Sequence, residues 1–408
     1  MRGNAHPGAR LSRMQTFDNP PHDIALVGTG GIAVIHADAV ARLGGRARVV
    51  AAVDVDPVRL ATFGQRFGIP RLYPDLASLL GEHRPALVNL CTPPGGHAEQ
   101  ALTCLTAGVP VLCEKPPALS LAELDMIAEA SGRSGAGFAT VFQHRFGSAG
   151  LALARLVADG SLGPAHTAVC HTLWYRPDEY FAVPWRGQWE TEGGGPTMGH
   201  GIHQIDLMLA ILGPWREVVA VAARQARPTA TEDLSCAIVS FDSGAVATVV
   251  NSLLSPRETT YLRFDFARAT VELTHLYGYG DADWTVTGAP GEQDRVTSLW
   301  ARNLTGVSSG HSAQLTHVFD ALEAGTPMPV SPLDARQTME LVAAIYASAF
   351  TGQSVRRGEI GPGSPFYQRM DGPGAPWAGD GSPLVRPATA VPSQPGASSL
   401  RFAPEDSS

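Results

Sequence analysis

The first third of the chain alternates short apolar runs with longer amphipathic segments. The apolar runs predict strands at 23–27, 48–53, 71–73, 86–91, 111–113 and 139–142, and the segments between them predict helices, among them 57–67, 98–107 and 121–131. The run at 86–91 is continuously apolar, which is typical of a strand buried on both faces. Strands separated by helices predict an α/β domain with a doubly wound parallel sheet.

Beyond about residue 145 the pattern changes to strand-like runs that often alternate. A helix is predicted at 151–159, and strands at 165–174, 216–224, 234–241, 244–254, 259–266 and 269–274. Such alternation is typical of an antiparallel sheet with one face in water. Helical runs at 311–324 and 334–350 are expected to close this region. We therefore expect a first domain over 22–145 and an α+β domain with a large, open, mostly antiparallel sheet over 146–360.

The two ends of the chain lack any periodicity. Residues 1–21 and 361–408 contain many Pro, Gly and Ser residues, and we expect a disordered leader and a disordered tail there. A chain of 408 residues is also too long for one ordinary core, which agrees with two domains and two tails.

Composition narrows the classes of partner. The formal net charge is -8, so no basic face is expected and nucleic acid is an improbable partner. No apolar run reaches the roughly 18 residues of a membrane span. The five cysteines are odd in number and lack CxxC spacing, which predicts reduced thiols in a cytoplasmic protein.

A glycine-rich turn follows the first predicted strand. Its residues are Gly28, Thr29, Gly30, Gly31, Ile32 and the small Ala33. Glycines permit a tight turn and a close approach of a pyrophosphate, which the amides at a helix start then face. Asp54 ends the next strand, where a carboxylate accepts from ribose hydroxyls and repels a 2′-phosphate, so NAD is favoured over NADP. The alternative is an ordinary βα turn with Asp54 as a helix cap.

Polar residues also follow the later strands. Thr92, Pro93 and His97 come after one strand, and Glu114 and Lys115 come after the next. The carboxyl ends of parallel strands face one crevice, so we expect these residues to line the cofactor site. Two alternatives stand beside this: His97 caps the helix that it begins, and Glu114 and Lys115 form a surface ion pair on a turn.

The second region contains Gly193-Gly194-Gly195 and then a helix predicted to run to about residue 212. His200 and His203 lie near its start. Aromatic and arginine residues precede it, a combination that suits a sugar ring and its hydroxyls or a carboxylate. The substrate contacts predicted from this region and its borders are Arg145, Arg176, Tyr180, Trp185 and His200, with His311 and Gln314 as weaker candidates. Packing or surface roles are the alternative for each.

Over about residues 23–355 the chain resembles the Gfo/Idh/MocA oxidoreductases. Four motifs in this order carry the resemblance: the G-x-G-x-x-A turn, Thr92-Pro93 with His97, Glu114-Lys115-Pro116 and the GGG…H-x-x-D stretch. The resemblance implies a Rossmann domain, an open-sheet domain and nicotinamide between them. It makes Lys115 and His203 the catalytic residues: the lysine polarises an oxygen of a sugar, cyclitol or polyol, and the histidine carries the proton during hydride transfer. It also implies a homodimer or homotetramer formed through the open sheet.

One residue departs from the family pattern. Many relatives have an aspartate four residues before the helix histidine, where this chain has Gly199, so the proton relay is in question. Two other functions remain open: an NAD-dependent glycosidase of the same fold, and a dinucleotide-sensing protein without catalysis. A metal site at His200, His203 and Asp206 is disfavoured because these residues do not share one helix face, and no metal is predicted.

Overall fold

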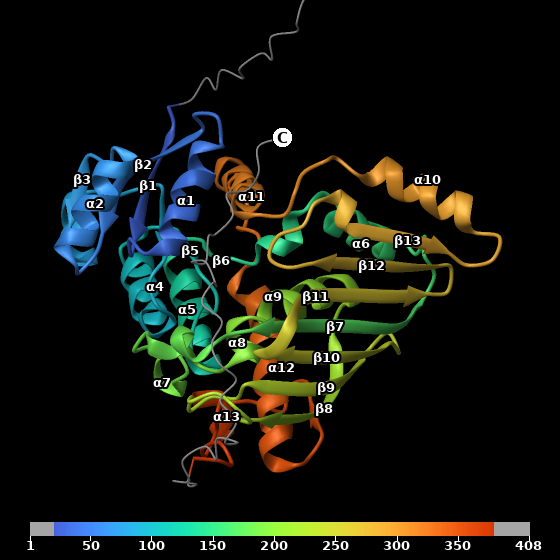
Figure 1. Cartoon of the computed structure of the whole chain (residues 1–408). Coiled ribbons are helices and arrows are strands. Elements are labelled where there is room, and N and C mark those ends of the chain that lie inside the picture. Colours follow the sequence, from blue (N-terminus) through green and yellow to red (C-terminus); the bar gives the residue numbers. More distant parts are fainter. Residues whose placement is uncertain (1–19, 379–408) are drawn as a thin grey trace, which may run out of the picture.

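The computed structural model describes residues 20–378, which form two sheets with helices around them (Figure 1). All but the last two residues of the predicted leader 1–21 lie outside this range. The first sheet is parallel, with the strand order β3-β2-β1-β4-β5-β6. Its strands are β1 (His22–Val27), β2 (Ala47–Val53), β3 (Arg71–Tyr73), β4 (Leu87–Leu90), β5 (Val111–Cys113) and β6 (Phe138–Thr140).

The helices between these strands are α1 (Gly31–Ala41), α2 (Pro57–Phe67), α3 (Leu76–Glu82), α4 (His97–Thr106) and α5 (Leu121–Ser134). Their ends follow local chemistry. Asp56 accepts from the amides of Val58 and Arg59 at the start of α2, and Gly68, with a φ of 64°, ends that helix. The predicted doubly wound parallel sheet is confirmed.

One helix was assigned to the wrong domain. The helix predicted at 311–324 is observed as α11 (His311–Ala324), but it packs on the first sheet beside α1 (Figure 1). Its residues Leu315, Val318 and Phe319 belong to the same core as Ile24 and Leu26 of β1. A parallel sheet needs helices on both faces, and an apolar helix stripe does not say which sheet it will cover.

The second sheet has eight strands in the order β13-β12-β11-β7-β10-β9-β8-β14. Neighbours are antiparallel except for β7 and β10. The strands are β7 (Ala165–Tyr175), β8 (Trp215–Ala223), β9 (Leu234–Phe241), β10 (Val246–Ser252), β11 (Leu254–Phe266), β12 (Ala269–His275), β13 (Trp284–Gly288) and β14 (Val355–Arg356). The predicted open, mostly antiparallel sheet is confirmed, although β13 and β14 were not foreseen.

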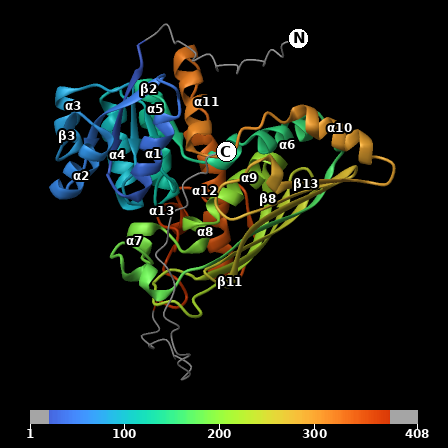
Figure 2. The ribbon, with the colours of Figure 1, turned by 45° about the horizontal axis from the view of Figure 1, so that its top comes forward.

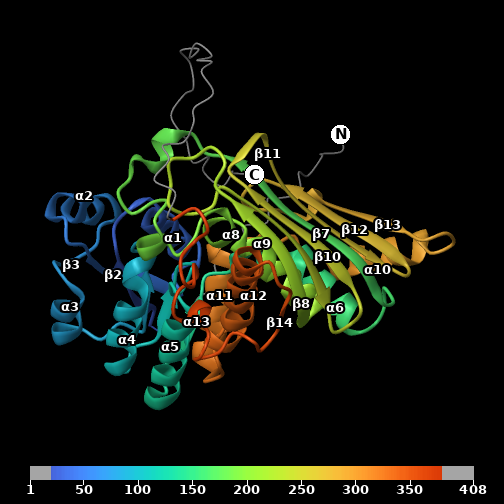
Figure 3. The same ribbon diagram turned by 90° about the horizontal axis from the view of Figure 1, so that it is seen from below.

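One face of this sheet is covered and the other is bare. The longer helices of the region are α6 (Ser148–Ala158), α9 (Ile202–Leu212), α10 (Gln293–Asn303) and α12 (Pro332–Thr351), of which α10 was not predicted. α9 packs on β7 and α12 packs on β8. In the described part of the chain no helix lies on the opposite face (Figure 2, Figure 3).

The predicted tail begins too early. Residues 361–378 are folded against α5 of the first domain and α12 of the second, and they include α13 (Pro365–Gln368). Phe366 is buried, the Tyr367 hydroxyl donates to Asp125 (2.9 Å), and the Trp377 indole donates to the Ala230 carbonyl (2.8 Å). Three isolated aromatic anchors in a Pro- and Gly-rich segment leave no periodic signal. Residues 379–408 lie outside the described range.

The remaining elements are short: η1 (Pro94–Gly96), η2 (Gln143–Phe146), η3 (Asp178–Ala182), α7 (Trp189–Glu192), α8 (Pro196–Gly199) and η4 (Asp281–Asp283). All five cysteines are unpaired. None of the helices within residues 20–378 combines the length and the apolar character that crossing a bilayer requires.

Candidate active site

The glycine turn leaves room for a dinucleotide. Gly28 has a φ of +86°, and a Cβ there would lie 2.9 Å from the Cys91 carbonyl, so a side chain is excluded on both grounds. A Cβ at Gly30 or Gly31 would meet nothing within 4 Å. α1 begins at Gly31 without a side-chain cap, so the amides of Gly31 and Ile32 have no partner within the helix, while that of Ala33 donates to the Gly30 carbonyl (3.1 Å). Open space in front of free helix amides fits the pyrophosphate of NAD.

Asp54 lies beside this turn but is already engaged. Its carboxylate accepts from the Thr29 amide (2.8 Å), the Thr29 hydroxyl (2.7 Å) and both Nε and Nη2 of Arg59 (3.0 and 2.8 Å). Burial would raise the pKa of Asp54, but the hydrogen bonds from Arg59, Asp56 and Thr29 hold it well below its ordinary value. Ribose hydroxyls would therefore share this carboxylate with Arg59, or displace it.

His97 does not face the crevice as a ligand contact. It is fully buried, with Nδ1 2.7 Å from the Pro116 carbonyl oxygen and Nε2 2.8 Å from the Thr92 carbonyl oxygen. The predicted cofactor contact is therefore corrected: His97 ties the segment after β4 to the segment after β5. The Thr92 hydroxyl donates to Gln100 (2.6 Å).

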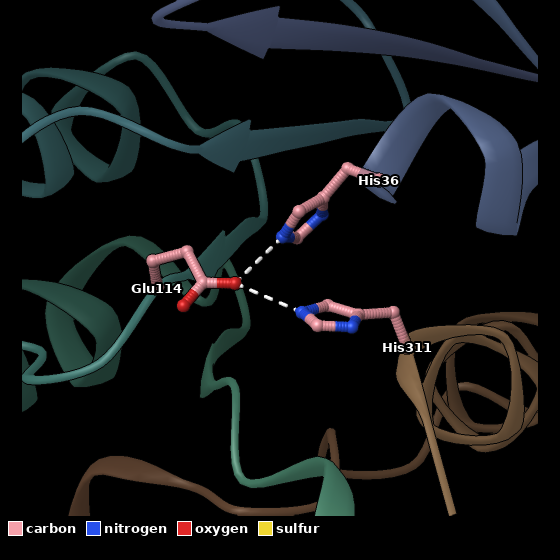
Figure 4. Close-up of side chains that lie close together, drawn as sticks. All are labelled: His36, Glu114 and His311. Atoms are coloured by element: carbon pink, nitrogen blue, oxygen red, sulfur yellow. Dashed lines mark hydrogen bonds and ion pairs between the residues drawn. The ribbon is translucent and has the colours of Figure 1, made fainter. Parts of the chain in front are cut away.

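Glu114 joins three parts of the chain. Its Oε1 accepts from Nε2 of His36 on α1 (2.8 Å) and from Nε2 of His311 on α11 (3.0 Å), as Figure 4 shows. Burial would raise the pKa of Glu114, but these two imidazoles hold it well below its ordinary value. The carboxylate thus fixes the end of β5 between a helix of the first half and a helix of the second.

The same three side chains have the spacing of metal ligands, the one such group within residues 20–378. The hydrogen bonds account for them without an ion. The Asn89 amide donates to Nδ1 of His36 (3.0 Å), which makes Nε2 the protonated nitrogen that donates to Glu114. A protonated nitrogen has no lone pair for a metal.

Lys115 reaches across to the second domain. Its Nζ donates to the Gly199 carbonyl at the end of α8 (2.7 Å). Burial lowers the pKa of this amine, and the charges of Glu114 and Glu192 oppose that effect only in part. Lys115 is also the single lysine among the 408 residues, so the chain carries one side-chain amine, and it lies here.

His203 lies in the first turn of α9, four residues after Gly199. It is buried, stacks on His144 with ring centroids 4.9 Å apart, and has no hydrogen-bond partner at Nδ1. Burial, the charge of Lys115 and the neighbouring His144 lower its pKa well below the ordinary value. The imidazole is therefore neutral at pH 7, which is the form that can accept a proton.

A wall of aromatic rings and guanidinium groups stands beside Lys115. The Arg176 guanidinium lies 4.8 Å from the Trp174 ring and donates to Glu258 (2.8 Å). His200 contacts the edge of Trp174 and has no partner at Nδ1, while its Nε2 is 3.4 Å from the Tyr180 hydroxyl. The charges of Arg176 and Lys115 add to burial in lowering the pKa of His200.

The wall includes a residue that was not singled out. Arg186 lies 3.9 Å above the Tyr180 ring and 4.4 Å above the Trp185 ring, and it donates to the Tyr180 hydroxyl. Of the predicted substrate contacts, Arg176, Tyr180, Trp185 and His200 are thus grouped around Lys115 and Arg186. The sequence signal for Arg186 was its position directly after Trp185.

Two other expectations are corrected. Arg145 donates twice to Asp206 of α9 (both 2.6 Å), and Asp206 also accepts from Thr338, so this guanidinium joins elements and is not a substrate contact. Because Asp206 faces Arg145, it does not form a metal site with His200 and His203. The weaker candidate Gln314 donates to the Thr140 carbonyl (2.7 Å), which is also a structural role.

Three further residues at the site were missed: His36, His144 and Glu192. His36 follows the glycine turn on the inner side of α1, and His144 follows β6. Glu192 directly precedes the three glycines. A polar residue next to a glycine run or a strand end was the only signal for each, and such residues are common in turns.

Comparison with known proteins agrees with this geometry. D-apiose dehydrogenase of Paraburkholderia graminis is 28% identical over 350 residues, which are 81% of this chain and 88% of that protein. D-glucoside 3-dehydrogenase of Escherichia coli is 26% identical over 82% of this chain and 97% of its own. Among solved structures, the WlbA dehydrogenase of Bordetella pertussis, in complex with NADH and UDP-GlcNAcA, has a TM-score of 0.74 at 25% identity and covers 83% of this chain and 100% of that one.

Two family models also match. Residues 22–141 match the model described as an oxidoreductase family with an NAD-binding Rossmann fold, and residues 151–291 match the GFO/IDH/MocA C-terminal domain. Together they span well over half of the chain and both of its sheets. The chain therefore belongs to the Gfo/Idh/MocA family of NAD-dependent oxidoreductases.

Proposed function

We propose that this enzyme transfers hydride between NAD and the CH–OH carbon of a sugar, cyclitol or related polyol, with Lys115 and His203 as its catalytic residues. The observation that carries the proposal is the contact of the Lys115 amine with the Gly199 carbonyl, four residues before His203. The effect of the Lys115 charge on the pKa of His203 supports a shared site for an amine of the first domain and an imidazole of the second.

The two side chains suit the proton chemistry of alcohol oxidation. NAD, when bound, accepts the hydride, and the hydroxyl proton must leave at the same time. Lys115 binds the substrate oxygen through its N–H groups and stabilises the charge that develops there. His203 is neutral and has an unpartnered Nδ1, so it is available to take the proton.

The wall beside Lys115 supports a polyhydroxylated substrate. Arg176, Arg186 and His200 lie against the rings of Trp174 and Tyr180, and they supply polar atoms for the oxygens of a sugar. Relatives named D-apiose dehydrogenase, D-glucoside 3-dehydrogenase and myo-inositol 2-dehydrogenase agree with this class.

A screen of sugars and cyclitols for NADH formation at 340 nm tests the proposal. We expect Lys115→Ala to remove at least about 3 kcal/mol of transition-state stabilisation, more than a hundredfold in kcat/KM. Arg133→Ala, an exposed change on α5, is the control and should not alter the rate. Unchanged rates in Lys115→Ala would remove this residue from the mechanism. Release of an aglycone without net NADH would instead identify a glycosidase.

We also propose that the bare face of the second sheet binds a second copy of the chain. Val219, Val221 and Ile238 are 55%, 68% and 58% exposed there. Register places Val219 opposite Ile238 and Val221 opposite Cys236, so they form one apolar surface. An apolar surface of this kind is typical of an interface between subunits.

Light scattering tests this assembly. The wild type is expected to be a dimer or a tetramer, and Val221→Glu is expected to be smaller because a charge would be buried in the interface. Val58→Glu, a matched change at a 74% exposed position of α2, should leave the mass unchanged. A monomeric wild type would contradict the proposal.

The five unpaired thiols further support a reducing, cytoplasmic location.

A further inference from the structure

Glu192 is a buried carboxylate next to the site that the proposed reaction does not use. It is 6% exposed and ends α7, just before Gly193. Its Oε2 accepts from the Gly187 amide (2.6 Å), and its Oε1 lies 3.5 Å from Nη1 of Arg186. Both oxygens are therefore held in place, one by the backbone and one by a guanidinium group that also lies over Tyr180.

The carboxylate of Glu192 and the amine of Lys115 meet at one residue. A Cβ built on Gly199 would lie 3.7 Å from Glu192 Oε1, and the Gly199 carbonyl accepts from Lys115 Nζ (2.7 Å). Their charges act on each other. The charge of Glu192 raises the pKa of Lys115 against the stronger effect of burial, and that of Lys115 lowers the pKa of Glu192, which burial raises.

We propose that Glu192 is the positioning residue for Lys115: its carboxylate supplies the negative charge that holds the ammonium group at Gly199, in the space toward which a side chain at position 199 would project. The inference rests on the proposed function, in which Lys115 acts on the substrate oxygen.

Glu114 raises the pKa of Lys115 more than Glu192 does, but its carboxylate is also engaged elsewhere. Glu114, the adjacent residue, is shared between two histidines, His36 and His311. Arg176 and Arg186 face Lys115 from the wall, and both lower the pKa of the amine. On the substrate side, Lys115 therefore lies near two other positive charges, those of Arg176 and Arg186. Glu192 is the carboxylate that offsets them there.

The proposal can be tested by enzyme activity in variants that remove the carboxylate at position 192 and introduce one at position 199. Glu192→Gln should lower kcat/KM at least about tenfold, a part of the 10²–10⁴ that a positioned proton-transfer group contributes. Gly199→Asp in the same chain should restore at least about half of that loss on a logarithmic scale. The site accepts the new side chain, because the Gly199 backbone is not left-handed and its Cβ makes an ordinary contact. Glu190→Gln, an exposed carboxylate of the same helix, is the control and should keep the wild-type rate.

Titration of Lys115 tests it without substrate. In a chain grown with lysine labelled with ¹³C at Cε, the single lysine gives one signal, whose shift with pH reports its pKa. We expect a lower midpoint in Glu192→Gln, and a midpoint near that of the wild type in Glu192→Asp and in Glu192→Gln with Gly199→Asp. Equal midpoints in the wild type and Glu192→Gln would overturn the inference. A wild type without turnover would instead count against the proposed function, and the titration would still decide the role of Glu192.

Discussion

At the scale of single residues, opposing effects determine the charges in the site. Burial lowers the pKa of Lys115, and Glu114 and Glu192 partly restore it. Burial also lowers the pKa of His203, and Lys115 lowers it further. The result is an amine closer to losing its proton than an exposed lysine, beside an imidazole that starts without one. Both groups therefore carry less positive charge at neutral pH than an exposed lysine and an exposed histidine would.

The pairing of Asp54 with Arg59 predicts the choice of coenzyme. In the wild type Asp54 should repel a 2′-phosphate, so NAD is preferred. Asp54→Ser removes that repulsion and frees the half-exposed Arg59, which can then bind the phosphate. We expect the ratio of kcat/KM for NADP to that for NAD to rise at least about tenfold, measured with one substrate and both coenzymes.

An aspartate that caps the next helix serves as the control for this change. Asp75→Ser keeps a good cap at the start of α3 and removes a carboxylate that belongs neither to the glycine turn nor to the ion pairs of Arg59, so the coenzyme ratio should not move. A wild type that prefers NADP would show that Asp54 does not act as proposed.

Residues with a local motif were easier to predict than residues with a distant partner. Lys115 and His203 each belong to a short pattern, and the charge of Lys115 acts on the His203 imidazole in the folded chain. The wrong substrate contact, Arg145, is paired with Asp206, 61 residues later, and no local pattern reveals that partner. Likewise, the ring of His97 lies between two carbonyl groups, those of Thr92 and Pro116, that adjoin separate strands.

At the scale of elements, the segment after Gly193-Gly194-Gly195 forms two helices in place of one. One helix was predicted through the two histidines, but α8 ends at Gly199 and α9 begins at Ile202. Glu232 anchors the first piece, because its carboxylate accepts from the amides of Gly195 (2.9 Å) and Thr197 (3.1 Å). The break leaves the Gly199 carbonyl free to accept from Lys115.

Gly195 lies so close to Glu232 that a side chain at this position would disturb the contact between Glu232 and α8. A Cβ there would lie 1.9 Å from the Glu232 carbonyl oxygen, so Gly195→Ala must displace α8 or the segment that precedes β9. We expect a loss of about 1–3 kcal/mol in the free energy of unfolding, measured with urea, together with a lower kcat/KM as the Gly199 carbonyl moves.

The same substitution in an open helix provides the comparison. A Cβ on Gly132 of α5 would meet nothing within 4 Å, so Gly132→Ala should leave kcat/KM unchanged and stabilise the fold by up to about 1 kcal/mol. Equal stability of Gly195→Ala and the wild type would show that the contact with Glu232 relaxes at no cost.

Periodicity located most elements but not their neighbours in space. The helices at 57–67 and 311–324 were predicted with their observed bounds. The sheet that the second of these covers was not predicted, because an apolar stripe is equally suited to either core. The short strands β13 and β14 and the segment 361–378 were missed because two to five residues, or single aromatic anchors, carry no period.

At the scale of the whole molecule, the two halves of the chain interlock around buried histidines. α11 comes late in the sequence, yet it covers the first sheet and carries His311 to Glu114 at the end of β5. Lys115 reaches the opposite way, to α8. The site therefore exists only when both domains are folded together, which makes the stability of the whole chain a condition for activity.

His144 gives this stability a pH dependence that can be measured. Burial lowers its pKa from about 6.5 in the unfolded chain to about 3, so below pH 6.5 the unfolded chain binds a proton that the folded chain does not. Its contribution to stability is complete above pH 6.5 and is lost as the pH falls toward about 3. At pH 5.5 the loss from this residue alone should be about 1.4 kcal/mol.

A variant without the imidazole isolates this effect from other titrating groups. Glu232, whose pKa is raised to about 7 by burial, acts in the opposite direction, since it favours the folded state as the pH falls. It is present in both chains and cancels in the comparison. Urea unfolding at pH 7.5 and 5.5 should therefore show a smaller acid loss in His144→Gln than in the wild type, by about 1 kcal/mol. Equal losses in the two chains would mean that His144 reaches water and takes up its proton in the folded protein.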